Sequence, residues 1–473
     1  MNIIPDVRIG RSPDYWCTWT TQCTTKPANV RGGDYINESL IFAPETGWVN
    51  FYPEIRSELY FVLDDGWDVP ADAALPQYGT LYPDPIKFPS LHGTQTERLA
   101  QLNAKIQSAG WRGAGLWIAT NYIENGETKP YVAPDPTAEG YWRERAVMSH
   151  KAGIEYWKAD WGNNCESMTF RRMLTDVARE AHPRLLVEHG RGHRPFNGTG
   201  APGNCRFTQD EAYFCYNMGV ATFSDVLRIY DLSTLSVATA LDRIASYVPV
   251  CKGILNCEDE LYMGAALGCA VGIMRHPGCE CAEEALAAVR WHRVAPAFSG
   301  GNLRVSDRLL TESHFYESPA CGMDGPGTIY QQAPAVVARN TALPEVLNAD
   351  APMISFVAAS MNPSGAYSVA AFRRQTDGAR PDLPAVICRP ETPARYIGVF
   401  GDFSELTIVA GEPQGRLVTR VLAQSLIRGE AVDITAHAVL DGHRIFLPAA
   451  LLRSFRNVGD GSELALMLKV SYT

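Results

Sequence analysis

The chain has 473 residues, of which 46% are hydrophobic, and it carries a formal net charge of −10. This amount of apolar material is sufficient for one large domain and one smaller domain. Neither a nucleic acid nor an anionic membrane surface is expected as a partner, because either would require a basic protein surface.

The N-terminal residues 1–8 lack the basic start and the apolar core of a secretory signal, which predicts a cytoplasmic protein. The longest weakly polar stretch, residues 264–274, is too short to cross a bilayer and is typical of a buried helix. We therefore expect no membrane partner.

The 12 cysteines are scattered along the chain, and this favours free, buried thiols over disulfides in a protein of this size. A zinc site is the alternative for one group of residues, namely Cys257, His276, Cys279 and Cys281. Because the chain contains no Cys-x-x-Cys pair, we expect no metal.

An apolar run over residues 59–63 predicts a buried parallel strand that ends at two adjacent carboxylates, Asp64 and Asp65. Gly66 turns the chain at this point, and Trp67 follows it. Paired carboxylate oxygens accept hydrogen bonds from sugar hydroxyls, and an indole ring covers the apolar face of a pyranose. This strand end is therefore typical of a sugar pocket; the alternative is an acidic loop beside a tryptophan of the core.

Strands and helices then alternate along the chain. Thr94 and Glu97 form a capping box that opens a helix, Gly110 ends this helix, and a strand follows over 115–119. Further helices are expected over residues 142–150, 167–181, 233–247 and 282–294. The alternation predicts a (β/α)8 TIM barrel, whose active site lies at the carboxyl ends of its parallel strands.

A second strand of this barrel ends in charge, at Lys158 and Asp160. The two residues are two apart, so their side chains point to the same face of the strand. A nearby ammonium keeps a carboxylate ionised at neutral pH, and an ionised carboxylate fixed beside a sugar is a candidate nucleophile for a covalent glycosyl intermediate. The alternative is a structural ion pair between the two residues.

Both strand ends resemble the retaining α-galactosidase and α-N-acetylgalactosaminidase group of glycoside hydrolases. The motifs are Leu-Asp-Asp-Gly-Trp at 63–67 and Lys-Ala-Asp-Trp-Gly at 158–162, and residues 16–19 (Trp-Cys-Thr-Trp) are similar to the Gly-Trp-Asn-Ser-Trp segment of that group. The resemblance implies that Asp160 is the nucleophile and Asp231 the general acid/base. The residues that it implies for substrate binding are Trp19, Asp64, Asp65, Trp67, Lys158, Glu188 and Arg228.

Individual roles also follow from the resemblance. Asp64 and Asp65 would bind the O6 and O4 hydroxyls of the sugar, Lys158 would hold O3 or O4, and Glu188 would help to read the 2-substituent. The chain departs from the group at Arg228, since only two residues separate this arginine from Asp231 where the group often has three.

Other polar residues have two interpretations each. The segment that contains His189, Arg191, His193 and Arg194 is either a solvated basic loop or a site for an acidic sugar. Trp161 is either a wall of the sugar pocket or a core residue. His276 and His292 lie on apolar stretches and are expected to be structural.

After about residue 350, closely spaced strands replace the alternating pattern. They are expected over residues 354–357, 367–370, 395–399, 416–418 and 464–468. Turns rich in proline and glycine divide them, as in an antiparallel β-sandwich. We therefore predict a catalytic barrel over residues 1–345 and a C-terminal antiparallel β-sandwich domain over residues 346–473.

The sequence thus predicts a retaining α-glycosidase, most similar to α-galactosidases, that hydrolyses a terminal α-linked galactose-configured sugar by double displacement. The alternatives are an enzyme of the same group that acts on N-acetylgalactosamine or on a β-L-arabinopyranoside, and a carbohydrate-binding relative that has lost hydrolysis. Glu188 favours a free 2-hydroxyl, because a carboxylate crowds an acetamido group. The expected partner is an oligosaccharide or glycoside, no cofactor is required, and a homo-oligomer remains open.

Overall fold

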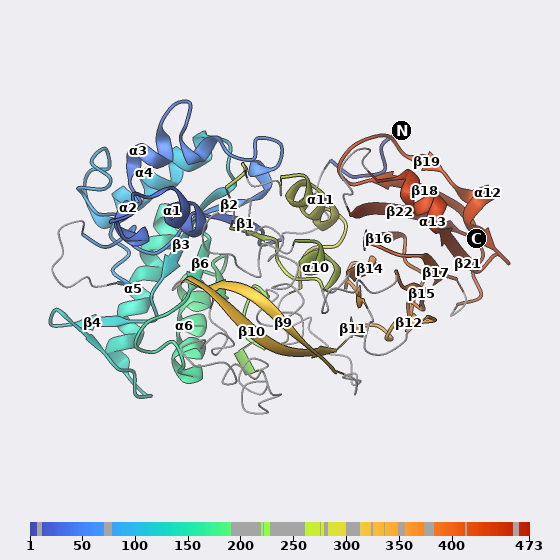
Figure 1. Ribbon diagram of the computed structural model, residues 1–473. Coiled ribbons are helices and arrows are strands. Elements are labelled where there is room, and N and C mark those ends of the chain that lie inside the picture. Colours follow the sequence, from blue (N-terminus) through green and yellow to red (C-terminus); the bar gives the residue numbers. More distant parts are fainter. Residues whose placement is uncertain are drawn as a thin grey trace.

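Parallel strands with flanking helices occupy the first part of the chain, and two β-sheets occupy the last third (Figure 1). The structure is a computed structural model. It describes residues 1–6, 12–70, 78–190, 219–220, 222–227, 261–274, 276–278, 282–298, 313–322, 325–334, 336–348, 355–372, 383–411, 414–456 and 463–473.

Six parallel strands form the sheet of the first part, in the order β7-β6-β3-β2-β1-β8. All of their pairings are parallel. Their bounds are β1 (Tyr15–Cys17), β2 (Tyr60–Leu63), β3 (Gly113–Ile118), β6 (Tyr156–Ala159), β7 (Leu186–His189) and β8 (Gly272–Ile273). The first strand therefore lies in the middle of the sheet, beside a strand from a distant part of the chain.

One short segment contacts both edges of this sheet. Val226 forms a parallel bridge with Glu188 on β7, and the carbonyl of Leu227 accepts a hydrogen bond of 2.7 Å from the N–H of Ala270, just before β8. The sheet is therefore curled toward closure. The described residues do not show a complete eight-stranded barrel, and the helix predicted over 233–247 lies outside them.

The helices beside the sheet begin at capping side chains. The predicted capping box is confirmed, because Thr94 and Glu97 bond each other's backbone N–H at the start of α4 (Gln95–Ser108). Asp135 caps α5 (Pro136–Ala152), and Ser167 caps α6 (Met168–Ala181). Among the helices that the structure describes, none is both long and apolar enough to cross a membrane.

Shorter elements fill the connections at the rim of the sheet. Between β1 and β2 lie α1 (Trp19–Thr25), α2 (Gly32–Tyr35), α3 (Glu38–Phe42) and the 3-10 turns η1 (Trp48–Asn50) and η2 (Arg56–Glu58). A hairpin of β4 (Tyr122–Glu124) and β5 (Glu127–Lys129) follows β3. A ribbon of β9 (Ser313–Gly322) and β10 (Gly325–Pro334) precedes the C-terminal sheets.

The larger C-terminal sheet has seven strands. They are β11 (Val336–Arg339), β13 (Phe356–Met361), β14 (Tyr367–Phe372), β16 (Tyr396–Gly401), β22 (Leu464–Tyr472), β18 (Val418–Ser425) and β19 (Val432–Asp433). The smaller sheet has five, namely β12 (Glu345–Val346), β15 (Ala385–Cys388), β17 (Glu405–Val409), β21 (Arg444–Pro448) and β20 (Val439–Leu440). Two short helices, α12 (Thr435–Ala438) and α13 (Ala449–Ser454), complete this part.

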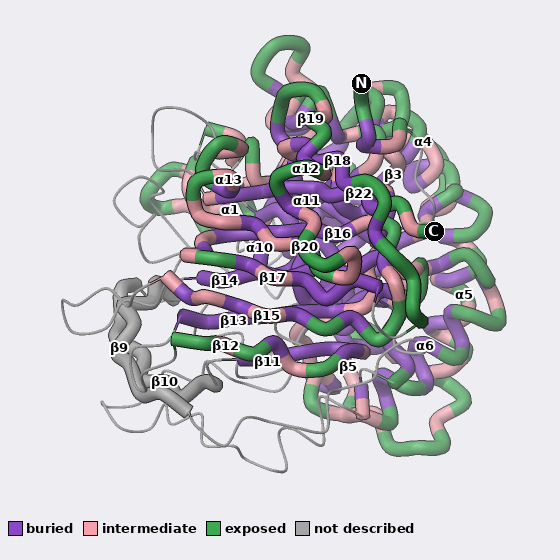
Figure 2. Tube along the Cα trace, turned by 90° about the vertical axis from the view of Figure 1, so that its right-hand side faces the viewer, coloured by how far each residue is buried: buried purple, intermediate pink, exposed green. Residues whose placement is uncertain are grey.

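Both sheets contribute to one hydrophobic cluster, with Val369 and Val399 from the larger sheet and Leu406 and Ile408 from the smaller one. Strands β14 and β16 are accordingly buried (Figure 2). The prediction of a purely antiparallel arrangement is wrong, because the pairs β11–β13, β14–β16 and β15–β17 are parallel. Strand β11 also precedes residue 346, and the division of the chain at that point stays a prediction.

Two helices, α10 (Leu261–Ala266) and α11 (Ala282–His292), lie between the parallel sheet and the C-terminal sheets (Figure 1). The hydroxyls of Ser360 and Ser368 donate hydrogen bonds of 2.7 and 2.8 Å to the carbonyl of Ala266, at the end of α10. Trp291 on α11 packs edge-on against Phe400 with a centroid distance of 6.0 Å. The two parts therefore share packed aromatic and polar contacts.

A buried histidine joins this helix layer to the first strand. His292 is fully buried, as predicted for a structural residue, and its Nδ1 lies 2.8 Å from Oδ1 of Asp14. The same carboxylate oxygen accepts the N–H of Val271 at 3.0 Å. Asp14 thus fixes α11 and the entry to β8 against the entry to β1.

We expect Asp14→Asn to lower the free energy of unfolding by about 3 kcal/mol, because removing one member of a buried charged contact leaves the others unsatisfied. Denaturant unfolding followed by circular dichroism measures this. Asp176→Asn is the matched control, since Asp176 is exposed on α6 and its substitution should leave the unfolding midpoint nearly unchanged. Equal effects of the two substitutions would contradict the role given to Asp14.

Candidate active site

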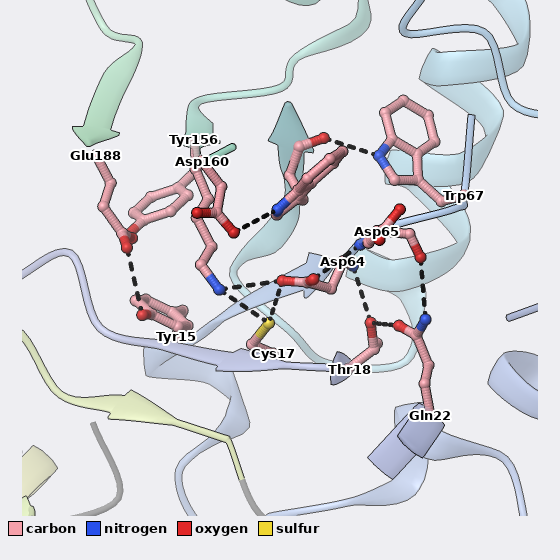
Figure 3. Close-up of polar contacts among 12 residues, drawn as sticks. Tyr15, Cys17, Thr18, Gln22, Asp64, Asp65, Trp67, Tyr156, Asp160 and Glu188 are labelled. Carbon is pink, nitrogen blue, oxygen red and sulfur yellow. Dashed lines mark hydrogen bonds and ion pairs between the residues drawn. The ribbon is translucent and has the colours of Figure 1, made fainter. Parts of the chain in front are cut away.

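Polar and charged side chains come together at the carboxyl ends of four parallel strands, β1, β2, β6 and β7 (Figure 3). Because parallel strands all end at the same edge of a sheet, residues far apart in sequence meet there. The residues that gather in this way are Cys17, Asp64, Asp65, Lys158, Asp160 and Glu188.

Lys158 and Asp64 form a buried ion pair at the centre of this group. The Lys158 Nζ lies 3.0 Å from Oδ2 of Asp64, across the intervening strand β3. Burial by itself lowers the pKa of Lys158, but the charge of Asp64, together with smaller contributions from Cys17, Tyr15 and Glu188, outweighs burial and raises this pKa well above its ordinary value. The ammonium therefore pairs with Asp64, and the pair that the sequence spacing suggested between Lys158 and Asp160 is not the one formed.

Cys17 completes the surroundings of this pair. Its Sγ donates to the same Oδ2 of Asp64 at 2.9 Å and lies 3.6 Å from the Lys158 Nζ. Burial, and then the charge of Asp64, raises the pKa of the Cys17 thiol well above its ordinary value. The thiol thus keeps its proton and acts as a neutral donor beside the ion pair.

Asp64 is held on both of its carboxylate oxygens. Its Oδ1 accepts the N–H of Asp65 at 2.8 Å, while its own N–H donates to Oγ1 of Thr18 at 2.9 Å. Together with Lys158 and Cys17, three donors therefore fix the Asp64 carboxylate. These bonds give the Asp64 carboxylate a structural role in the site, in addition to any contact with a ligand.

Asp65 has a different environment. Its Oδ1 is buried and has no hydrogen-bond partner among the described residues. Burial raises the pKa of Asp65 to about 8, and the charges of Asp64, Asp68 and Asp160 contribute to this rise. At neutral pH this carboxyl is mostly protonated and can either donate to or accept from a hydroxyl of a ligand.

The turn after Asp65 admits only glycine. Gly66 has a φ of +95°, and a Cβ at this position would lie 1.9 Å from the carbonyl oxygen of Gly33. The amine of Lys87 bridges the carbonyls of these two glycines at 3.1 and 2.7 Å. This close approach of two backbone segments fixes Asp65 against the connection between β1 and β2.

Asp160 follows β6 and is partly exposed. Its Oδ2 accepts a hydrogen bond of 3.0 Å from the indole Nε1 of Trp117 on β3. Trp67 in turn donates from its own Nε1 to the backbone carbonyl of Trp117 at 2.9 Å. Two indole donors thus link the turn after β2 to the carboxylate after β6.

Trp67 itself lies in the hydrophobic core with no exposed surface. Its indole is covered by protein in this structure, and its role in substrate binding stays a prediction. The alternative interpretation, a tryptophan of the core beside an acidic turn, agrees with its position.

Other aromatic rings are closer to the surface of the site. Trp161 is partly exposed, and its ring centroid lies 4.7 Å from that of Tyr78 and 5.3 Å from that of Trp117. Asp68 accepts the N–H groups of Gly79 and Leu81, which fixes the segment that carries Tyr78. Trp161 also packs against the buried cluster that contains Tyr78 and Trp117, so both interpretations of Trp161 stay open.

Glu188 is fully buried on β7, in register with Lys158. The hydroxyl of Tyr156 donates to its Oε2, and the hydroxyl of Tyr15 lies 3.5 Å from its Oε1. Trp19 is partly exposed at the start of α1 and packs against the buried cluster that contains Tyr15 and Cys17. Glu188 therefore lies beside Lys158, and the binding roles of Glu188 and Trp19 stay predictions.

Arg228 and Asp231 lie outside the described residues, and so do Arg191, His193, Arg194, Cys257, Cys279 and Cys281. The roles of Arg228 and Asp231 stay predictions. Within the described ranges, no group of three or more His, Cys, Asp or Glu side chains could hold a metal ion.

Two residues of the site had no assigned role in the sequence analysis. The Cys17 side chain lies within a motif used for the resemblance, but its contact with Asp64 depends on the register of β1 against β2. Arg171, on α6, bonds the backbone carbonyl of Asp160 at 3.1 Å. Its neighbour Arg172 is exposed, and the sequence pattern alone does not separate the two arginines.

No protein-family model matches the sequence, and no curated protein matches it either. Among solved structures, a β-L-arabinopyranosidase of glycoside hydrolase family 27 from Geobacillus stearothermophilus is similar at 10% identity, with 98% of this chain and 97% of that chain covered and a TM-score of 0.40. An α-galactosidase from Saccharomyces cerevisiae is similar at 11% identity, with 98% of each chain covered and a TM-score of 0.38.

An α-galactosidase of family 36 from Geobacillus stearothermophilus is similar at 14% identity, with 98% of this chain and 56% of that chain covered and a TM-score of 0.40. These similarities are remote.

The raised pKa of Asp65 predicts how stability depends on pH. Because the folded state holds this proton up to about pH 8 and the unfolded state releases it near pH 4, the free energy of unfolding should fall as pH rises through this window. Asp65→Asn removes the titration, so the stability advantage of the variant over the wild type should grow from pH 5 to pH 9. Thermal unfolding at several pH values measures this, and parallel curves would contradict the prediction.

Proposed function

We propose that the chain is a retaining α-glycosidase that hydrolyses a terminal α-linked galactose-configured sugar by double displacement. The observation that carries this proposal is the buried pair of Lys158 and Asp64, with the carboxyls of Asp65 and Asp160 beside it at the carboxyl ends of parallel strands. A complete (β/α)8 barrel that carries this site is part of the proposal.

The contacts of this group suit the recognition of hydroxyls. Two of the three N–H groups of Lys158 donate hydrogen bonds to Asp64 and Cys17, and the third can donate to a hydroxyl at O3 or O4 of the sugar. The Oδ1 of Asp65 is a buried polar atom that a hydroxyl at O4 would satisfy. Glu188 lies in register with Lys158 and is assigned to the 2-hydroxyl.

In the proposed reaction, Asp160 attacks the anomeric carbon and forms a covalent glycosyl intermediate. The Trp117 indole holds one carboxylate oxygen in place, which leaves the other free to form the bond. Asp231 is assigned to protonate the leaving oxygen and then to activate the water that releases the sugar. None of these steps requires a cofactor.

The closest alternatives are N-acetylgalactosamine or a β-L-arabinopyranoside as the substrate, and a binding protein without hydrolysis. A panel of p-nitrophenyl glycosides separates them, because each substrate alternative predicts a different preferred glycoside and the binding protein predicts none. A cytoplasmic location and the open question of a homo-oligomer stay predictions from the sequence.

We expect Asp160→Gly to lower kcat on the preferred glycoside at least ~10³-fold, because the variant lacks the attacking atom. Azide should restore part of the rate and yield a glycosyl azide of inverted anomeric configuration, which NMR of the product identifies. Asp176→Gly, an exposed acid on α6, is the control and should keep its activity. Near wild-type kcat in Asp160→Gly would contradict the assignment of the nucleophile.

Discrimination at O4 provides a second test. A glucoside presents O4 equatorially and would leave the buried Asp65 carboxyl without its partner, and sites built around one hydroxyl reject analogues by ~10⁴-fold or more. We therefore expect kcat/KM on the α-galactoside to exceed that on the α-glucoside by orders of magnitude, and Asp65→Asn to reduce this ratio. Asp34→Asn, an exposed acid on the same rim, should leave the ratio unchanged.

A further inference from the structure

We propose that Arg171 is a positioning residue for Asp160, held in its working orientation by a closed hydrogen-bond circuit through His189 and Thr175. The proposal rests on the proposed function, because it takes Asp160 as the nucleophile. It concerns Arg171, Thr175 and His189, whose side chains are all buried.

Arg171 fixes the segment of backbone that carries Asp160. The side chain is fully buried on α6. Its NH1 donates to the carbonyl of Ala159 and its NH2 to the carbonyl of Asp160, each at 3.1 Å, while Nε donates to the carbonyl of Cys165 at 2.8 Å. One planar guanidinium thus binds the residue before Asp160, Asp160 itself and the end of the following turn.

His189 orients this guanidinium from the neighbouring strand. Because an arginine only donates, the Nδ1 of His189 must accept the hydrogen bond of 3.2 Å from NH1 of Arg171. The imidazole is therefore neutral, with its proton on Nε2, which lies 2.8 Å from Oγ1 of Thr175. The Thr175 hydroxyl donates at 3.0 Å to the backbone carbonyl of Arg171, and this closes the circuit.

This arrangement also changes the interpretation of His189. The sequence analysis placed it in a basic loop, but it is the last residue of β7 and is buried. Since the circuit leaves no vacant position on either ring nitrogen, His189 neither faces solvent nor offers a contact to an acidic sugar.

The buried charge of Arg171 indicates that this residue has a role beyond packing. Every acceptor of its hydrogen bonds among the described residues is neutral, and burying a charge without a charged partner costs free energy. The buried face of α6 is otherwise mostly apolar, with Phe170, Leu174 and Val177 on it. An apolar residue at position 171 would fit this face without that cost, but it could not hold the carbonyl of Asp160.

The nucleophile is thereby clamped at two points. The Arg171 guanidinium binds its backbone carbonyl, and the Trp117 indole binds its carboxylate. Reaction rates are sensitive to the placement of reacting atoms, and a displacement of about 1 Å costs ~10²-fold. A loosened backbone at Asp160 should therefore reduce kcat far more than it changes substrate binding.

The test compares Arg171→Met, Arg171→Lys, Thr175→Val and the control Arg172→Met on the glycoside that the wild type hydrolyses. Arg172 is the matched control, because it is the exposed neighbour on the same helix and packs over the ring of Phe223. We expect kcat to fall ~10²-fold in Arg171→Met, with KM changed little, and less in Thr175→Val. The lysine variant should recover part of the rate, and Arg172→Met should match the wild type.

A second background separates positioning from a general structural role. In Asp160→Gly, rescued by saturating azide, the nucleophile no longer depends on the protein backbone. Adding Arg171→Met to this variant should leave the rescued rate unchanged if Arg171 acts through Asp160. An equal loss in both backgrounds, or wild-type kcat in Arg171→Met, would overturn the proposal.

Two outcomes that concern folding and function are also decisive. If Arg171→Met fails to fold, as circular dichroism would show, the comparison of Thr175→Val with Arg172→Met carries the test, and a wild-type kcat in Thr175→Val overturns the proposal. A wild-type protein that hydrolyses no glycoside removes the proposed function together with this inference. An active wild type whose kcat withstands both substitutions removes the inference alone.

Discussion

The ion pair between Lys158 and Asp64 is the constraint on which the rest of the site depends. Two charges buried together cost more in desolvation than their attraction returns unless further hydrogen bonds satisfy them. The surrounding residues supply these bonds, since Cys17, Thr18 and the N–H of Asp65 all serve the Asp64 carboxyl or its backbone. The pair also spans β3 and so sets the spacing between the ends of β2 and β6.

The adjacent acids show how environment separates chemically identical groups. Asp64 is ion-paired and bonded on both oxygens, whereas Asp65 next to it has a buried oxygen without a partner in the described ranges and a pKa raised to about 8. Asp160, a third carboxyl nearby, is partly exposed and accepts a hydrogen bond from the Trp117 indole. One edge of the sheet thus presents three different groups to a ligand. Asp64 is an ion-paired carboxylate, Asp65 is a mostly protonated acid, and Asp160 is an accessible carboxylate.

Much of the fold and part of the site could be predicted from local sequence pattern. The strand before Asp64, the capping box at Thr94 and the helix after Ser167 follow from apolar runs and capping residues, and they are observed. Partners across the sheet could not be predicted in the same way. The period of a strand gives the face of Lys158 but not the neighbour it meets, and the burial of Trp67 and the parallel pairs of the C-terminal sheets depend on contacts between distant segments.

The helix layer between the two parts has a consequence for how the molecule comes apart. Helix α10 precedes β8 and α11 follows it, and both helices pack on the C-terminal sheets through Ala266, Trp291 and Tyr262. The strand that pairs with β1 is therefore braced from outside by a region more than 80 residues further along the chain. Loss of that brace would expose the edge of β1 that β8 covers, so we expect the two parts to unfold together.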